Sequence, residues 1–295
     1  MFEEVKGLVT SVLDGYCACI LAYGQTGSGK TYTMEGEENA ENEGVIPRTL
    51  QALYSSMHQQ TQCSYSVTIH MFEIYNEKLF DLLAENKPIE ARLDTDGHVL
   101  FPTAVCVNVH ELAEMQEVLK KGKEARRIAS TSSNQHSSRS HMLFILSITS
   151  VNPSTHQQTQ GRLVLVDLAG SERVSKTEST GQRLIEGQYI NKSLSSLGDV
   201  IHALNNKHKH IPFRNSMLTF ILQDVLAEGN KVLVITQLSP AFSNTQESLQ
   251  SLEFANRVNK ISLGKGVENK NHAMVAKLND MVVFSTWVLF CRMIS

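Results

Sequence analysis

The sequence predicts an α/β fold: a central, mostly parallel but mixed sheet with helices on both faces. Short apolar segments rich in β-branched residues alternate along the chain with segments whose apolar residues recur at helical spacing. In addition, the apolar segment 18–23 leads directly into a glycine-rich loop and then a helix start. Strands that alternate with helices are typical of a sheet that contains parallel strands.

The individual elements follow from their own patterns. The longest helix, for example, is indicated by an apolar stripe that starts at Ile190 and ends at Leu204. A last helix begins where Asn244 and Glu247 form a predicted capping pair. In chain order we expect a helix that ends at 14, strands at 18–23 and 66–75, a helix at 111–129, strands at 142–150 and 163–167, helices at 190–204 and 218–225, a strand at 232–238 and a helix that ends near 258.

The composition is that of one large globular domain, since 41% of the 295 residues are apolar and 19% are charged. The net charge of -3 gives no argument for a nucleic-acid partner. The five cysteines are odd in number and lack metal-ligand spacing, as expected for a reduced, intracellular protein. The acidic N-terminus does not resemble a signal peptide, and the apolar segment 281–295 is too short to span a membrane. We expect a domain at 1–264, then a linker and apolar tail of unknown role at 265–295.

A glycine-rich loop that fits G-x-x-x-x-G-K-[ST] follows the predicted strand 18–23 and precedes a helix. Its glycines let the backbone curl so that several N–H groups point at one phosphate, and the helix N-terminus adds a favourable partial charge. Lys30 can reach the β- and γ-phosphates, and Thr31 can ligate Mg²⁺. The motif predicts a P-loop site for a nucleoside triphosphate with Mg²⁺, without saying which nucleotide. Its residues are Gly24, Gln25, Thr26, Gly27, Ser28, Gly29, Lys30 and Thr31.

Two polar clusters lie beside predicted strands. The run 134–141 (NQHSSRSH) precedes one strand, and 167–172 (DLAGSE) directly follows another. Asp167, at the C-terminal end of a strand, is placed for an Mg²⁺-water contact in this class of site. Gly170 has no side chain to block a γ-phosphate from its backbone N–H. Each cluster alone is compatible with a solvated loop or a turn, but their occurrence in this order after a phosphate loop favours two nucleotide-sensing switches.

Together, GQTGSGKT, NQHSSRSH and DLAGSE resemble the three nucleotide-site motifs of the kinesin family, and all three are intact in this chain. The segments 190–194 (INKSL) and 212–216 (PFRNS) are similar to that family's microtubule-facing helix and the loop after it. The resemblance extends over residues 2–264. It implies the kinesin motor fold and a microtubule motor driven by ATP hydrolysis, with ATP and Mg²⁺ as cofactors, located on the microtubule cytoskeleton in the cytoplasm.

The resemblance also assigns roles within the site. Arg139 would pair with Glu172 when the switches close around the γ-phosphate, which Gly170 would sense. Because phosphoryl transfer depends mainly on positioning and charge stabilisation, no strong base is required. Loss of the γ-phosphate would then release both switch loops. The implied catalytic residues are Ser138, Arg139, Gly170 and Glu172, and the implied metal-binding residues are Thr31, Ser138 and Asp167.

The partner implied by the resemblance is the microtubule, whose tubulin is acidic, so we expect a surface with local cations. Without the resemblance, the basic residues concerned would indicate only a solvated loop. Met217 departs from the family pattern, because it stands where lysine is usual and so removes one expected cation. Contacts of this kind weaken as salt rises. The predicted microtubule-binding residues are Arg173, Lys176, Lys192, Lys207, Lys209 and Arg214.

The segment 257–264 (RVNKISLG) is similar to the end of kinesins whose motor lies at the C-terminus, which implies movement toward the minus end. The resemblance also implies that a complete motor has further strands before residue 1. Without them, the strand 232–238 would present an exposed apolar edge. The chain shows no sustained heptads, so dimerisation would need segments outside it.

Two other functions stay open at this point. The first is a non-motile or inactive microtubule-binding fragment with an impaired nucleotide site, which predicts filament binding with little stimulated turnover. The second is an unrelated P-loop GTPase. It is disfavoured because the segment 191–194 (NKSL) lacks the Asp of an N-K-x-D guanine-reading motif.

Overall fold

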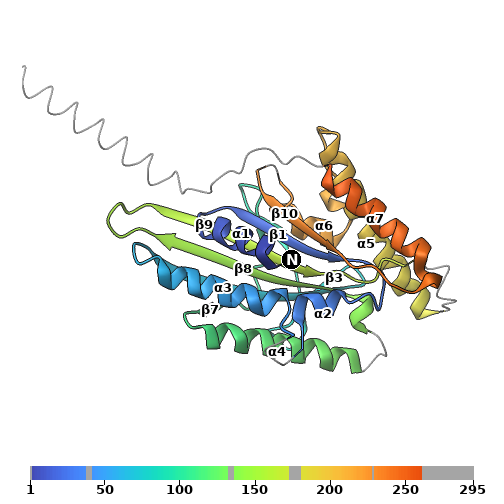
Figure 1. The fold of residues 1–295 in the computed structure, drawn as a ribbon, viewed down its shortest axis with the longest axis horizontal. Helices are drawn as coiled ribbons and strands as arrows, with labels where there is room; N and C mark the ends of the chain where they lie inside the picture. The colour runs from blue at the N-terminus through green and yellow to red at the C-terminus, as the bar shows by residue number, and fades with distance from the viewer. Residues whose placement is uncertain (1, 38–41, 132–135, 173–180, 228, 261–295) are drawn as a thin grey trace, which may run out of the picture.

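The computed structural model describes residues 2–37, 42–131, 136–172, 181–227 and 229–260. A mixed sheet lies between two layers of helices, as the sequence predicts (Figure 1). In chain order its strands are β1 Cys17–Tyr23, β2 Ser64–Tyr75, β3 Lys78–Asp81, β4 Lys87–Ile89, β7 Val107–Val109, β8 His141–Val151, β9 Gln158–Asp167 and β10 Lys231–Thr236. The spatial order is β10-β1-β9-β8-β2-β3-β4, with β7 also paired to β2. A separate pair is formed by β5 Arg92–Leu93 and β6 Val99–Leu100.

The parallel part of the sheet is smaller than the sequence patterns indicate. β1 pairs in parallel with β9 on one side and with β10 on the other. β8, β2, β3 and β4 continue the sheet in antiparallel pairs. The connection explains the direction of β8: it ends at Val151 and β9 begins at Gln158, and so short a link joins only antiparallel strands. The carboxyl ends of β10, β1 and β9 therefore meet at one edge of the sheet.

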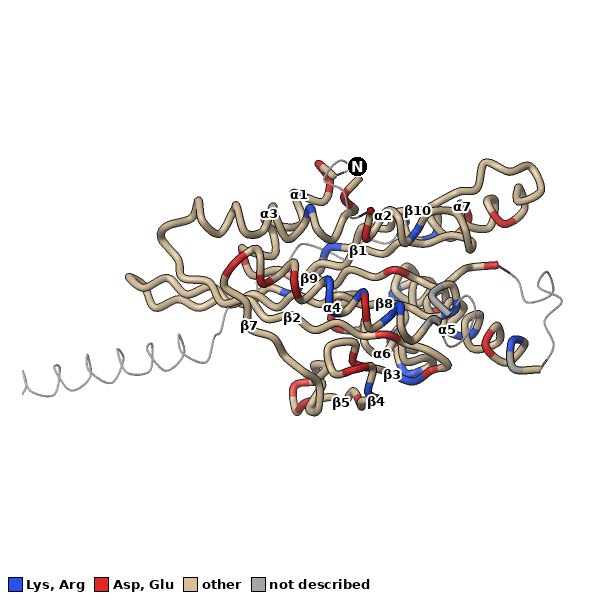
Figure 2. The backbone as a smooth tube through the Cα atoms, turned by 90° about the horizontal axis from the view of Figure 1, so that it is seen from below, with Lys and Arg blue, Asp and Glu red and all other residues tan. Residues whose placement is uncertain are grey.

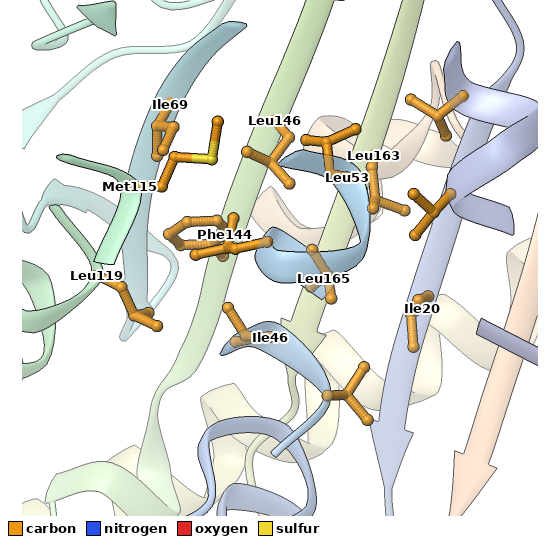
Figure 3. Close-up of a cluster of buried hydrophobic side chains, with 14 of the residues drawn as sticks. Ile20, Ile46, Leu53, Ile69, Met115, Leu119, Phe144, Leu146, Leu163 and Leu165 are labelled. Atoms are coloured by element: carbon orange, nitrogen blue, oxygen red, sulfur yellow. The ribbon is translucent and has the colours of Figure 1, made fainter. Parts of the chain in front are cut away.

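The helices divide between the two faces of the sheet. They are α1 Phe2–Leu13, α2 Lys30–Glu35, α3 Val45–Gln59, α4 Leu112–Thr131, α5 Gln182–Asn205, α6 Met217–Leu222 and α7 Thr245–Asn259. α1 to α4 pack with one face in a first hydrophobic core, and α5 to α7 pack with the other face in a second core. Strand β1 serves both cores, since Ile20 points into the first and Leu21 into the second. Figure 3 shows part of the first core, to which α3 contributes Leu53 and β9 contributes Leu163.

Every predicted element is present, but several observed elements have no counterpart among the predicted ones. These are α3 and the short strands β3, β4, β5, β6 and β7. Asn244 is the residue that precedes α7, but its side chain makes no capping hydrogen bond, and its Nδ2 donates to Ser239 Oγ at 3.0 Å. The predicted capping chemistry at this helix is therefore wrong. None of the helices within the described ranges is long and apolar enough to cross a bilayer.

Strand β10 pairs with β1 alone and forms the outer strand on its side of the described sheet. All its residues except Lys231 are half-buried. Leu233 and Ile235 pack against the first core, and Val232 and Val234 against the second. The predicted apolar edge is thus confirmed for the described residues. Such an edge offers unpaired backbone groups to any extended segment nearby.

Two glycines give opposite predictions for replacement by alanine. A Cβ at Gly161 in β9 would lie 1.9 Å from the backbone oxygen of Val12, whereas a Cβ at Gly7 in α1 would meet nothing within 4 Å. We expect Gly161→Ala to lower the free energy of unfolding by about 1–3 kcal/mol, as overpacking does. Gly7→Ala should raise it by about 0.5–1 kcal/mol, because alanine favours a helix over glycine. Urea unfolding followed by circular dichroism measures both, and equal effects would contradict the close packing of α1 on β9.

Candidate functional site

The glycine-rich loop joins the end of β1 to the start of α2 at the edge where the three parallel strands end. Asp167, the last residue of β9, lies in register with Ala22 of β1. Gly29 precedes α2 with a φ of 98°, in the left-handed region that glycine adopts without strain. The loop and Asp167 are thus brought together by strand pairing, as the sequence predicts.

Lys30 is buried and folds back into its own loop. Its Nζ donates hydrogen bonds to the carbonyl oxygens of Gly24 and Gln25, both at 2.8 Å. Burial lowers the pKa of Lys30, and the nearby carboxylates of Asp167 and Glu172 partly oppose this shift. A cation held this way in the centre of a loop is placed to receive a phosphate, which would take over its hydrogen bonds.

Thr31 and Asp167 provide a set of oxygen atoms that fits Mg²⁺. The Thr31 Oγ1 donates to Asp167 Oδ2 at 2.8 Å. Asp167 is 1% exposed, and its second oxygen, Oδ1, is buried without a hydrogen-bond partner. A buried carboxylate oxygen in this state needs a cation or a donor. Hydroxyl and carboxylate oxygens, together with water, are the ligands that Mg²⁺ prefers.

A buried arginine that belongs to none of the sequence motifs balances the charge of Asp167. Arg126 of α4 donates from Nη1 to Asp167 Oδ2 at 3.0 Å and to Glu35 Oε1 at 3.3 Å. Its Nε lies 3.7 Å from Glu73 Oε1, and Glu73 also accepts from Ser140 Oγ at 2.6 Å. Burial opposes the charge of Arg126, but the three carboxylates outweigh it and raise the pKa of the guanidinium. The sequence indicates this network at one point only, where Glu73 interrupts the apolar residues of β2 and so needs a buried partner.

The two switch motifs meet through their backbones. The Gly170 N–H donates to the Ser138 carbonyl at 3.0 Å, and the Ser171 N–H donates to the Gly24 carbonyl at 3.1 Å. A Cβ at Gly170 would lie 2.1 Å from Thr26 Oγ1 and 2.3 Å from Glu172 Oε2, so a larger residue here would require both side chains to move. The structure therefore brings Gly170 and Ser138 to the phosphate loop, as expected.

The two charged residues of the switches, Arg139 and Glu172, have different partners in this structure. Glu172 accepts from the Thr26 N–H at 2.8 Å and from Thr26 Oγ1 at 2.5 Å. Arg139 donates from Nη1 to Glu186 Oε2 at 2.9 Å. The pairing of Arg139 with Glu172, which the resemblance implies for closed switches, stays a prediction.

His141 links the second switch to α5. Its Nδ1 accepts from the Ala169 N–H at 3.0 Å, so the proton resides on Nε2, which lies 2.7 Å from Ser193 Oγ. Ser193 in turn donates to the Ile190 carbonyl at 2.8 Å. Burial lowers the pKa of His141 to about 3, with the positive charges of Arg126 and Lys30 acting in the same direction. The imidazole is therefore a neutral connector between a switch and a helix.

Four of the six predicted filament-binding cations are described by the structure, and they lie on α5 and just after it. Lys192 is exposed on α5 and lies 3.6 Å from Glu77. Lys207 and Lys209 are exposed in the turn after α5, and Arg214 is exposed in the 3₁₀ turn Phe213–Asn215. Figure 2 shows blue segments near the labels of α5 and α6, with acidic ones among them. Arg173 and Lys176 lie outside the described residues.

The titration of His141 gives a testable dependence of stability on pH. In the unfolded chain this histidine takes up a proton near pH 6.5, whereas in the folded chain it does so only near pH 3. Stability due to His141 is therefore lost as the pH falls below 6.5. Between pH 7.5 and 5.5 we expect the free energy of unfolding of the native chain to fall by about 1.4 kcal/mol more than that of a His141→Gln variant. Urea unfolding at both pH values measures the difference, and parallel losses would show that His141 is not held neutral.

A family model of the kinesin motor domain matches residues 1–261. Kinesin-like protein KIN-14E of Oryza sativa subsp. japonica is 44% identical over 286 residues, covering 96% of this chain and 26% of the relative. Kinesin-like protein KIN-14R of the same organism is 47% identical over 273 residues, covering 90% of this chain and 27% of the relative. The chain thus spans about a quarter of the length of the curated relatives it matches.

Solved structures agree with this match. The structure of a fast kinesin superposes with a TM-score of 0.83 at 38% identity, covering 90% of this chain and 77% of the other. The motor domain of the kinesin-like protein Kar3 of Saccharomyces cerevisiae gives a TM-score of 0.76 at 44% identity, covering 88% of this chain and 79% of the other. The chain therefore belongs to the kinesin motor-domain family.

Proposed function

We propose that this domain hydrolyses ATP with Mg²⁺ and couples the reaction to microtubule binding. The observation that carries the proposal is the meeting of Lys30, Thr31 and Asp167 with the backbone of Gly170 at the carboxyl ends of β1 and β9. A buried cation, an oxygen pair for Mg²⁺ and a backbone donor are the parts that phosphoryl transfer requires.

The roles of the residues follow from their contacts. When bound, Mg²⁺ neutralises charge on the phosphates. Lys30 would leave the carbonyls of Gly24 and Gln25 to bind phosphate, and Thr31 and Asp167 would hold the metal. The Gly170 N–H exchanges the Ser138 carbonyl for the γ-phosphate. Ser138 would help to hold Mg²⁺ or position the attacking water, and Arg139 would pair with Glu172 to order that water. All of these are acts of positioning and charge stabilisation.

Coupling to the filament is proposed through α5. This helix carries Lys192 on its exposed side and contacts the second switch through Ser193 and His141. Lys207, Lys209 and Arg214 extend the basic surface beyond the helix end. Arg173 and Lys176 are proposed members of the same surface. Movement toward the minus end is proposed for the full-length protein, from the segment after α7 and from the kinesin-14 names of the relatives.

The second candidate function is a microtubule-binding fragment with little turnover. It is favoured by one observation, the half-buried outer strand β10, which has a pairing partner on one side only within the described sheet. β10 pairs with β1, the strand that leads into the phosphate loop. If β10 is unstable without a second neighbouring strand, β1 and the phosphate loop would be destabilised with it. The two functions differ in stimulated hydrolysis and not in filament binding.

The ATPase rate of the purified chain, with and without microtubules at low salt, tests the proposal. We expect microtubules to stimulate hydrolysis strongly, and Lys30→Ala to reduce the stimulated rate by at least about 100-fold, since one charge-stabilising group is lost. Lys120→Ala, an exposed lysine of α4, is the matched control and should keep the rate. Filament binding without turnover, from soluble protein, would support the second candidate.

The basic surface gives a separate prediction about affinity. Replacing both Lys207 and Lys209 by alanine should weaken microtubule binding by roughly threefold to tenfold at low salt, because each exposed charge contributes less than about 1 kcal/mol. The difference from the native chain should shrink as salt screens the charges. Co-sedimentation with microtubules measures both effects. The matched control replaces Lys120 and Lys121 on the opposite face of the sheet, and an equal loss there would refute a local binding surface.

A further inference from the structure

Glu186 is a buried carboxylate that the catalytic roles above do not use. It lies in the first turns of α5 and is 3% exposed. It accepts from Arg139 Nη1 at 2.9 Å and from the Tyr75 hydroxyl at 2.7 Å. Its two donors come from different elements, the 3₁₀ turn His136–Arg139 and the end of β2. A buried charge needs such partners, because an uncompensated one is strongly destabilising.

The carboxylate that would order the attacking water is engaged elsewhere. Both oxygens of Glu172 accept from Thr26 in the phosphate loop, one from the backbone and one from the hydroxyl. Arg139 and Glu172 therefore each have another partner in this structure. Bringing them together requires Arg139 to leave Glu186 and Glu172 to leave Thr26.

We propose that Glu186 is a positioning residue that holds Arg139 away from Glu172, so that a movement of α5 releases the arginine for hydrolysis. This inference rests on the proposed function, because it assigns a control to the same site. Arg139 has two alternative acceptors, one on α5 and one in the second switch. The state of the site is then set by which carboxylate the guanidinium contacts.

The geometry of α5 connects this exchange to the filament surface. Glu186 and Lys192 lie on the same helix, about 9 Å apart along its axis at 1.5 Å per residue. Shifts of about 1–2 Å are typical of helices at interfaces. Such a shift is enough to break a hydrogen bond of 2.9 Å between Arg139 and Glu186. A filament that displaces Lys192 would in this way act on Arg139.

The turn after β2 holds α5 at two points. Tyr75 donates to Glu186, and Glu77, two residues later, pairs with Lys192 at 3.6 Å. The pKa of Tyr75 is raised to about 12 by burial and by its hydrogen bond to Glu186. The phenol therefore stays protonated and keeps donating at physiological pH. Tyr75 thus stabilises the arrangement in which Glu186 holds Arg139.

The test is single-turnover hydrolysis of ATP without microtubules, which product release does not limit. Glu186→Gln weakens the acceptor and should speed this hydrolysis about tenfold, the effect of one hydrogen bond to a charged group. Tyr75→Phe, the milder variant, should speed the same hydrolysis about threefold. Stimulation by microtubules should fall in both. The matched controls Glu117→Gln on α4 and Tyr65→Phe on β2 should change neither quantity.

Hydrogen exchange of the segment 136–140 without nucleotide provides a readout that does not depend on activity. Both variants should exchange faster there than the native chain, because Arg139 has lost its anchor. Slower or unchanged single-turnover hydrolysis together with unchanged exchange would overturn the role of Glu186. If the native chain hydrolyses no ATP, the proposed function fails, and the exchange result alone still decides whether Glu186 holds Arg139.

Discussion

The site depends on one buried carboxylate, that of Asp167 at the end of β9. Removing this charge from water costs several kcal/mol unless partners compensate for it. Arg126 supplies the compensation and, through the same guanidinium, draws in Glu35 of α2 and Glu73 of β2. Helices α2 and α4 and strands β2 and β9 are therefore tied together at the point where nucleotide would bind. The phosphate loop is attached to this network through Thr31.

The sheet makes this network possible because parallel pairing of β1 with β9 places Ala22 beside Asp167. The switch backbones then reach the phosphate loop by short hydrogen bonds, from Gly170 to Ser138 and from Ser171 to Gly24. A local change at the γ-phosphate position would in this way reach both switches.

The parts of the site that are contiguous in sequence were predictable, and those assembled from distant segments were not. The phosphate loop and both switches stand as uninterrupted motifs, so their positions beside the strands followed directly. Arg126, Glu73 and Glu186 come from separate helices and a strand, and no spacing relates them. The partner of Arg139 could not be predicted, because two carboxylates compete for it and sequence gives no distances. Likewise, strand direction in β8 to β4 depends on connections that apolar patterns do not reveal.

Two links of different kind run from the site to α5. His141 is neutral, and its two ring nitrogens make hydrogen bonds to Ala169 and Ser193, so a single proton position satisfies both. Arg139 is charged, and its acceptor Glu186 has a rival in Glu172. A neutral buried bond holds two elements at a fixed spacing, whereas a charged group with two acceptors can exist in two states. The hydrogen bonds of His141 keep α5 in contact with the second switch. Arg139 can contact either Glu186 on α5 or Glu172 in the second switch, so its link to α5 can be made or broken.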